Sequence, residues 1–344
     1  MQSKSSSYIN GFDWVRAFMS VAVVTWHLHT FGKSILYTEK FERFHINLPD
    51  LLNFHLVPVS VPAFILISCY FVARNQTDWP HLRHRLWRLA LLVIFWTVML
   101  SIWMGGYGEL KKMIPESPLD LLLKILSANG EYYYFFVSLI FCLLAAFIFT
   151  RLSTLWNWIA LTLSLVIMFF LPQIVMSNYQ TILISYWNPL NFLPYPFAAI
   201  LIYRYQDYFL ANGRSLLLSV LGLLAVGTIF AWYEWTHYIQ AVFLAEGLAF
   251  PLLMRVSHVF LGAAIVVLAL WPWRVAPAFI RFMSKHSLAV FVLHAFFRPI
   301  VLQNTPALGF PDALMRLLQL IAVILLCYLT SLVITAFIKD DLIR

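Results

Sequence analysis

Residues 11–27 read GFDWVRAFMSVAVVTWH and begin the first of many apolar segments in a chain of 344 residues. Hydrophobic residues make up 62% of the chain and charged residues 11%, whereas a soluble globular domain carries about 25% charged residues. So few charges cannot cover the surface of a soluble fold of this size. The composition therefore predicts an all-α integral membrane protein.

A helix that crosses the bilayer needs about 20 mostly apolar residues. Ten segments come close to that length, and the sixth and ninth are the weakest: 11–31, 52–73, 86–104, 133–150, 156–171, 189–204, 215–235, 256–271, 279–298 and 313–338. Residues 240–254 are also apolar, but the segment is short and contains Glu246 and Pro251, which favours a re-entrant or interfacial piece. We therefore expect a bundle of about ten transmembrane helices.

The net charge of +8 does not indicate a nucleic-acid-binding protein, because the basic residues lie in short loops between apolar segments. This is the positive-inside pattern, and the loop 74–88 shows it most strongly. Ten spans place both termini on one side, and the charge bias predicts that this side is the cytoplasm. The longest loop, 105–131 with an amphipathic turn at 118–127, is too short for a soluble domain. Residues 1–344 are thus expected to form one polytopic domain with no appended soluble domain.

The three cysteines fall inside apolar segments, so the sequence suggests neither a disulfide framework nor a metal site. They are Cys69, Cys142 and Cys327.

Ionisable residues inside a membrane span are costly and point to function. Arg16 and His27 are 11 residues apart, which is about three helical turns, so both leave the same helix face about 16 Å apart along the axis. A guanidinium binds phosphate through two parallel hydrogen bonds, and an imidazole can act as a general base toward a hydroxyl. Alternatively, Arg16 is a snorkelling anchor and His27 hydrogen-bonds a neighbouring helix. Asp13 lies close enough to pair with Arg16 and orient it.

This first span resembles the signature of membrane-bound acyltransferase family 3, the O-acyltransferases of bacterial surface polysaccharides. The family's hallmark is an arginine, ten residues and a histidine in the first span, which Arg16 and His27 match. The second span, VPAFILISCYFV at 61–72, resembles a second family motif. Ser68 and Tyr70 align with it, and Cys69 stands where glycine is usual. Ser68 also suits a close contact between helices.

The resemblance continues into the third span, where HLRHRLWRLALLVIFW at 81–96 carries a basic entry. Its three arginines, Arg83, Arg85 and Arg88, would form a cytoplasmic anion site suited to the phosphates of coenzyme A. The alternative is plain positive-inside anchoring.

Two further segments resemble family motifs. GEYYYFFVSLI at 130–140 carries Tyr134 or a neighbouring tyrosine where the family has a histidine. A tyrosine there suits stacking on a sugar ring or belongs to an interfacial aromatic belt. FMSKHSLAVFVLHAFFRP at 282–299 brings Ser287 and His294 to matching positions. His294 is a candidate polar contact for the acceptor, or it forms a structural hydrogen bond.

Residues 186–197, YWNPLNFLPYPF, contain three prolines that must interrupt a helix. Irregular backbone within a membrane is tolerated where it lines a cavity. The asparagines and aromatic residues of this stretch would suit a sugar, although a simple helix-entry turn also explains it.

The resemblance implies an O-acyltransferase, most consistently an O-acetyltransferase, in the bacterial inner membrane. Acetyl-CoA or another acyl-CoA would be the cytosolic co-substrate, and no metal is implied. The acceptor would be a hydroxyl of an extracytoplasmic or lipid-linked polysaccharide, such as an exopolysaccharide. Arg16 and the arginines of 83–88 would hold the donor, and His27 would take the hydroxyl proton, either in direct transfer or around a covalent acyl-enzyme. Expected partners are the glycan, membrane lipids and polysaccharide-biosynthesis proteins.

A transporter or flippase for a glycan or lipid-linked glycan is the alternative. Such proteins show membrane carboxylates or broken helices in both halves. Here acids are nearly absent from the spans and one proline-rich break stands out, which favours the enzyme.

Overall fold

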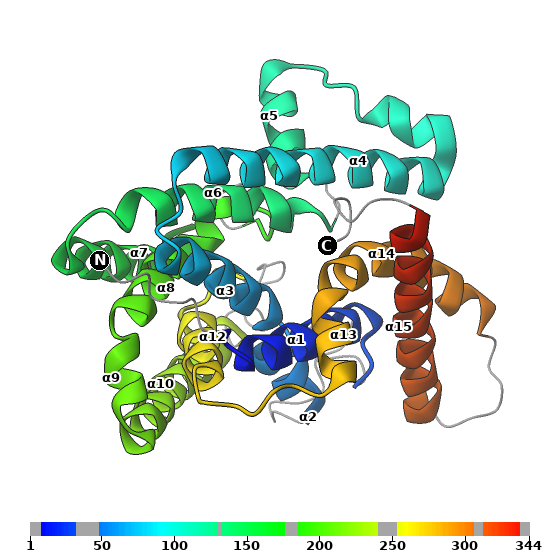
Figure 1. Ribbon diagram of the computed structural model, residues 1–344. Coiled ribbons are helices and arrows are strands. Elements are labelled where there is room, and N and C mark those ends of the chain that lie inside the picture. The colour runs from blue at the N-terminus through cyan, green and yellow to red at the C-terminus, as the bar shows by residue number, and fades with distance from the viewer. Residues whose placement is uncertain are drawn as a thin grey trace.

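The computed structural model describes residues 8–31, 48–128, 132–175, 185–239, 253–305 and 312–337. The secondary structure in these ranges is helical throughout (Figure 1). The elements are α1 Gly11–Leu28, α2 Leu48–Leu51, η2 Leu52–Leu56, α3 Ser60–Arg74, α4 Trp79–Lys112, α5 Pro118–Ser127, α6 Tyr134–Phe149, α7 Thr154–Val175, η4 Pro189–Phe192, α8 Pro194–Arg204, α9 Gln206–Ala211, α10 Gly213–Glu234, η5 Trp235–Ile239, α12 Val256–Ala269, α13 Ala278–Lys285, α14 Ser287–Asn304 and α15 Asp312–Phe337.

Six helices in the described part of the chain are long and apolar enough to cross a membrane. They are Leu52–Arg74, Trp79–Lys112, Thr154–Ile174, Gly213–His237, Ser287–Asn304 and Asp312–Phe337. Two shorter apolar helices, Tyr134–Phe149 and Val256–Ala269, accompany them. The chain is therefore a helical, multi-pass membrane protein, as the composition predicts.

Two predicted boundaries are wrong. The ninth span, 279–298, is interrupted at His286, whose ring bonds to the Ser331 hydroxyl on α15 at 2.7 Å. The short helix α13 is thus separate from the membrane-length α14. The third span is longer than expected, because Asp78 caps α4 by accepting from the His81 backbone N–H at 3.0 Å. This helix continues through a kink at Gly106, whose φ of 60° favours glycine.

Part of the predicted loop 105–131 is therefore helical. The amphipathic turn expected at 118–127 is confirmed as α5, which begins at Pro118 after the cap Ser117. The apolar segment 240–254 falls mostly outside the described residues, which resume at 253.

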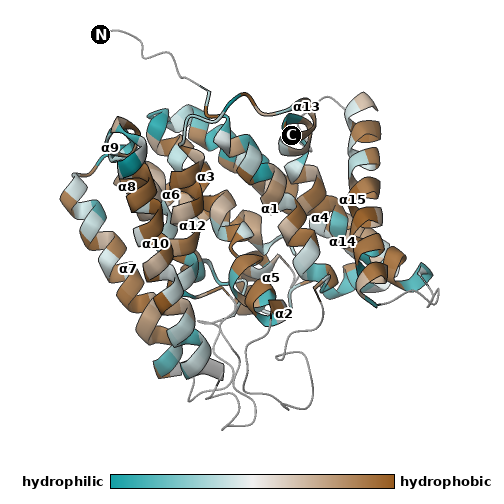
Figure 2. Ribbon diagram, turned by 90° about the horizontal axis from the view of Figure 1, so that it is seen from below, coloured by the Kyte–Doolittle hydropathy of each residue, from teal (hydrophilic) through white to brown (hydrophobic). Residues whose placement is uncertain are grey.

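Helix α3 forms the centre of the bundle and packs against α1, α6, α8 and α12. In its most apolar stretch 78% of the residues are buried, against 22% in α7 and in α10. The outer helices thus present most of their apolar surface to lipid, and hydrophobic residues run along them in Figure 2. The central position of α3 places its side chains between α1 and α6.

A buried ion pair fixes one end of this core. Arg255, which is 1% exposed, lies 2.9 Å from the carboxylate of Glu234. The guanidinium also donates to the Phe54 carbonyl and contacts His55 Nδ1 at 2.6 Å. A charge without a partner is strongly unfavourable in a buried site. This network therefore holds η2, α10 and α12 together.

Helix α1 approaches α12 so closely at Gly11 that a Cβ atom there would lie 1.9 Å from the Ala269 carbonyl oxygen. Gly11→Ala should therefore lower the free energy of unfolding by about 1–3 kcal/mol, the usual cost of overpacking. Thermal unfolding in lipid nanodiscs measures it. Gly222→Ala is the matched control, because a Cβ at Gly222 meets no atom within 4 Å. Equal melting temperatures for the two variants would contradict the close approach.

Candidate functional site

A cavity of about 630 Å³ lies near the starts of α1 and α4, and α13 contributes to its lining. Side chains from α1, α3, α4, α6, α13 and α14 line it. They include Ser68 and the two serines Ser284 and Ser287.

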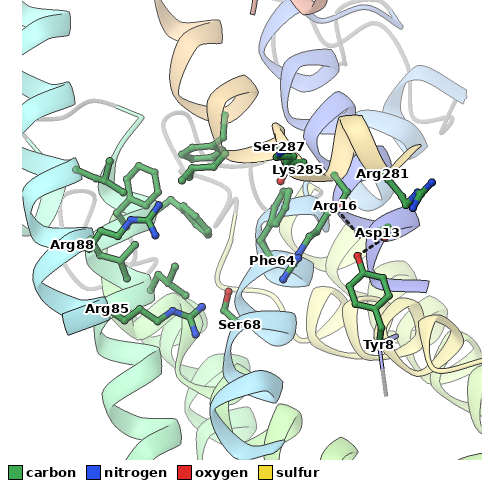
Figure 3. Close-up of a pocket in the computed structure, with 18 residues that line it drawn as sticks. Tyr8, Asp13, Arg16, Phe64, Ser68, Arg85, Arg88, Arg281, Lys285 and Ser287 are labelled. Atoms are coloured by element: carbon green, nitrogen blue, oxygen red, sulfur yellow. Dashed lines mark hydrogen bonds between the residues drawn. The ribbon is translucent and has the colours of Figure 1, made fainter. Parts of the chain in front are cut away.

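The cavity is strongly positive, because the lining includes five cationic side chains and one acid. The cations are Arg16, Arg85, Arg88, Arg281 and Lys285. Figure 3 shows Arg85 and Arg88 on α4 facing Arg16 on α1 across the space, with Ser68 on α3 between them. Arg281 and Lys285 are solvent-exposed, whereas the other three cations are half-buried. Guanidinium groups arranged in this way can bind a polyphosphate.

Asp13, the acid in the lining, holds the wall together. It is 4% exposed and accepts hydrogen bonds from the Tyr8 hydroxyl at 2.6 Å and the Ser284 hydroxyl at 2.7 Å. Burial and this bond to Asp13 raise the pKa of Tyr8 to about 12, so the phenol stays a donor. Asp13 thereby ties the start of α1 to α13.

The predicted pairing of Asp13 with Arg16 is not found among the ion pairs of the described residues. Arg16 instead lies over the Phe71 ring, 5.5 Å from its centroid. Its guanidinium is therefore left to face the cavity, while both Asp13 oxygens accept from hydroxyl groups.

The inner end of the cavity is aromatic. Phe64, Phe135 and Phe291 form a continuous wall, with ring centroids 6.4 Å apart for the first pair and 4.8 Å for the second. An uncharged, extended group fits such a surface, whereas phosphate does not. The cavity thus has a charged outer part and an apolar inner part.

His27 does not line this cavity but lies in a second cluster beyond the aromatic wall. Its ring stacks on His294 with centroids 5.0 Å apart and meets the edge of Tyr132 at 4.7 Å. Phe291 joins the two regions, because it lines the cavity and its ring centroid lies 6.0 Å from that of His294. We call His27, His294, Tyr132 and Arg298 the histidine cluster.

The hydrogen bonds of His294 define its tautomer. This side chain is fully buried, and its Nδ1 lies 3.2 Å from the Val290 carbonyl, which can only accept. Nδ1 is therefore assigned as the protonated nitrogen, and Nε2 carries a lone pair. The described residues provide no hydrogen-bond partner for that Nε2.

Three consecutive tyrosines at the start of α6 point in different directions. The Tyr132 hydroxyl accepts from Arg298 at 2.7 Å, and the Tyr133 hydroxyl donates to the Val292 carbonyl at 3.1 Å. Tyr134 packs edge-on against Tyr186, with centroids 5.2 Å apart. The tyrosine beside His27 is thus Tyr132, a neighbour of Tyr134.

Other predicted residues lie away from both regions. Arg83 is exposed and does not line the cavity, because it leaves α4 on a different side from Arg85 and Arg88. Tyr70 is fully buried and donates to the Gln206 side chain at 2.7 Å, so it ties α3 to α9.

The proline-rich stretch does interrupt the helix, since Pro189 begins η4 and Pro194 begins α8. Its residues are absent from the lining of the 630 Å³ cavity. The Asn191 amide donates to the backbone carbonyls of Ser185 and Tyr186, which fits a structural turn.

Arg298, Arg281 and Lys285 were not singled out as site residues from the sequence, and Tyr132 was covered only as a neighbour of Tyr134. Arg298 carried a usable signal, since it is a charge near the end of an apolar segment. The described residues contain no group of three or more His, Cys, Asp or Glu side chains that could hold a metal ion.

These features define a helical membrane protein with a positively charged cavity near a paired-histidine cluster. The family model described as an acyltransferase domain matches residues 9–336, so the chain belongs to acyltransferase family 3. The protein is thus a membrane acyltransferase. Searches of curated proteins and of solved structures gave no significant match.

Ser284→Ala should lower the free energy of unfolding by about 1–3 kcal/mol, because it removes one of the two hydroxyl donors to buried Asp13. Denaturant unfolding in detergent measures the effect. Ser219→Ala is the control, since that hydroxyl only bonds the Ser215 carbonyl within its own helix. An effect no larger than the control's would show that Asp13 does not depend on Ser284.

Proposed function

We propose that this protein transfers an acyl group, most consistently acetyl, from cytosolic acyl-CoA to a hydroxyl of an extracytoplasmic or lipid-linked polysaccharide. The observation that carries this proposal is the positively charged cavity whose aromatic inner wall adjoins the histidine cluster. Membership of the acyltransferase family supports the reaction class.

The two parts of the cavity suit the two parts of acyl-CoA, the phosphates and the uncharged arm. The phosphates of coenzyme A are polyanionic, and Arg16, Arg85 and Arg88 offer guanidinium groups on two sides of the space. Arg281 and Lys285 add positive charge at the exposed rim, where they attract an anion from solution. The uncharged pantetheine arm and thioester would follow the phenylalanine wall toward His27.

The proposed orientation has about ten spans with both termini in the cytoplasm. Arg16 lies near the start of α1 and His27 near its end. The cavity then faces the cytoplasm, where acyl-CoA is made, and the histidine cluster lies deeper, toward the side of the glycan. This arrangement supports a bacterial inner-membrane enzyme that joins substrates from two sides.

The reaction would begin with a sugar hydroxyl beside His27. The imidazole takes the hydroxyl proton while the oxygen forms a bond to the thioester carbonyl carbon. The C–S bond then breaks, and the coenzyme A thiolate receives the proton from the imidazolium. His294 Nε2, which has no partner among the described residues, would accept a hydrogen bond from the sugar and orient it.

Replacing the cavity arginines should weaken donor binding selectively. Arg85→Ala and Arg88→Ala should each raise KM for acyl-CoA by about 10-fold or more, because a hydrogen bond to a charged group contributes about 1.5–3 kcal/mol. Arg83→Ala should leave KM near the native value, because Arg83 is exposed and outside the cavity. Steady-state kinetics in lipid measures all three. Equal effects at the three positions would contradict donor binding in the cavity and favour general surface attraction.

The function itself is tested with purified protein in lipid and radiolabelled acetyl-CoA, by following coenzyme A release and label transfer to a surface-glycan extract. The native chain should transfer label, and His27→Ala should lose on the order of 10²–10⁴ in rate, the usual contribution of a general base. Native melting temperature in the variant is the control for folding. A native chain that neither binds nor turns over acyl-CoA would contradict the proposal and favour glycan transport.

A further inference from the structure

Arg298 supplies the positive charge of the histidine cluster. It follows His294 by four residues on α14, so the two side chains leave the same helix face. Its Nη1 donates to the Tyr132 hydroxyl at 2.7 Å, and the ion pairs found among the described residues do not include it. A guanidinium near the end of a membrane helix without an acidic partner is unfavourable, which points to a use for the charge.

Two polar atoms of this cluster are buried without a hydrogen-bond partner in the described chain: Nε2 of His294 and Nε of Arg298. The first is an acceptor, by the tautomer assigned above, and the second is always a donor. Buried polar groups are normally satisfied, so these two atoms are available to hydrogen-bond a ligand or a water molecule. The ligand expected here offers both a hydroxyl that donates and an oxygen that accepts.

The cluster thus divides into a basic half and a donor half. The two imidazoles, stacked at 5.0 Å, form the basic half. Arg298 and Tyr132 form the donor half, and the Tyr132 ring lies 4.7 Å from His27 and 5.4 Å from His294. The Tyr132 oxygen already accepts from Arg298, so its own hydrogen can point to a third atom. That hydrogen and the Arg298 Nε–H are two donors on groups that a direct hydrogen bond joins.

We propose that Arg298 and Tyr132 stabilise the oxyanion formed during acyl transfer, as catalytic residues additional to His27. This inference rests on the proposed acyltransferase function. When the sugar oxygen bonds to the carbonyl carbon, the π electron pair of the C=O bond moves onto its oxygen. The negative oxygen accepts hydrogen bonds from Arg298 and Tyr132, while His27 holds the proton. The electron pair returns as the C–S bond breaks, and the thiolate takes the proton.

Donors fixed before the reaction are effective because they need no rearrangement as charge develops in a site with little water. Tyr133 contributes to that fixation, since its bond to the Val292 carbonyl holds the start of α6 against α14. The donor half therefore rests on two helices joined directly beside the reacting atoms.

The test is steady-state kinetics of the native chain, Tyr132→Phe, Arg298→Met and Arg298→Lys in lipid. Removal of one oxyanion donor typically lowers kcat by about 10²–10³. We expect that loss of kcat in Tyr132→Phe and Arg298→Met. KM for acyl-CoA should stay unchanged, because the proposed binding site for its phosphates is the cavity, which neither residue lines. Arg298→Lys should recover part of kcat, since it keeps a cationic donor. Tyr233→Phe is the control: its hydroxyl also accepts from a side-chain donor, Gln173, but lies outside the cluster.

The two donors should also act as a unit. Arg298→Met combined with Tyr132→Phe is expected to lose much less than the product of the two single losses, since each contributes to the same charge.

The outcomes separate this inference from the proposed function. A native chain without acyl transfer overturns the function and, with it, the oxyanion role. Native transfer with unchanged kcat in Tyr132→Phe and Arg298→Met overturns the oxyanion role alone. If Arg298→Met fails to fold, Tyr132→Phe and Arg298→Lys decide: full kcat in both means that the Arg298–Tyr132 bond is structural.

Discussion

The cost of placing a charged group in hydrocarbon governs where the ionisable side chains of this chain lie. Arg255 and Glu234 are 1% and 3% exposed, and they satisfy each other at 2.9 Å. Asp13 is similarly buried but is satisfied by hydroxyl groups rather than by a cation. These residues hold helices together. Arg16, Arg85 and Arg88 differ, because they surround an open space. The cluster of cations that lines this space locates the site.

Helices α1, α3, α6 and α14 connect the charged cavity to the histidine cluster. Helix α1 carries Arg16 near one end and His27 near the other. The phenylalanines of α3, α6 and α14 lie between them, and Phe291 contacts both the cavity and His294. A molecule with an anionic head and a neutral arm can satisfy both ends at once. Coenzyme A thioesters, the proposed donors, have that form.

Much of the fold follows from the sequence. Each of the ten predicted spans contains a helix in the structure, and the amphipathic turn at 118–127 is α5. Apolar length and turn chemistry are local properties, so they can be read from a single chain. The break at His286 was missed: the ring there contacts Ser331 on another helix, and such a tertiary contact leaves no local pattern in the sequence. Whether all ten segments cross the membrane stays a prediction, since six are long and apolar enough by themselves.

The site was only partly predictable for the same reason. Arg85 and Arg88 were grouped with Arg83, and only the direction of each side chain around α4 separates them. The choice among three adjacent tyrosines also depends on how α6 meets α14. Arg16 and His27 share a helix face, as their spacing predicts, but no local pattern indicates that an aromatic wall lies between their surroundings.

The most direct test of the account is an experimental structure of the protein in lipid with a non-hydrolysable thioether analogue of acyl-CoA. We expect the phosphates between Arg16 and the pair Arg85 and Arg88, and the acyl carbonyl beyond Phe291, within contact of His27. Phosphates bound on the side of the histidine cluster, or an arm that leaves the cavity without reaching Phe291, would contradict the account.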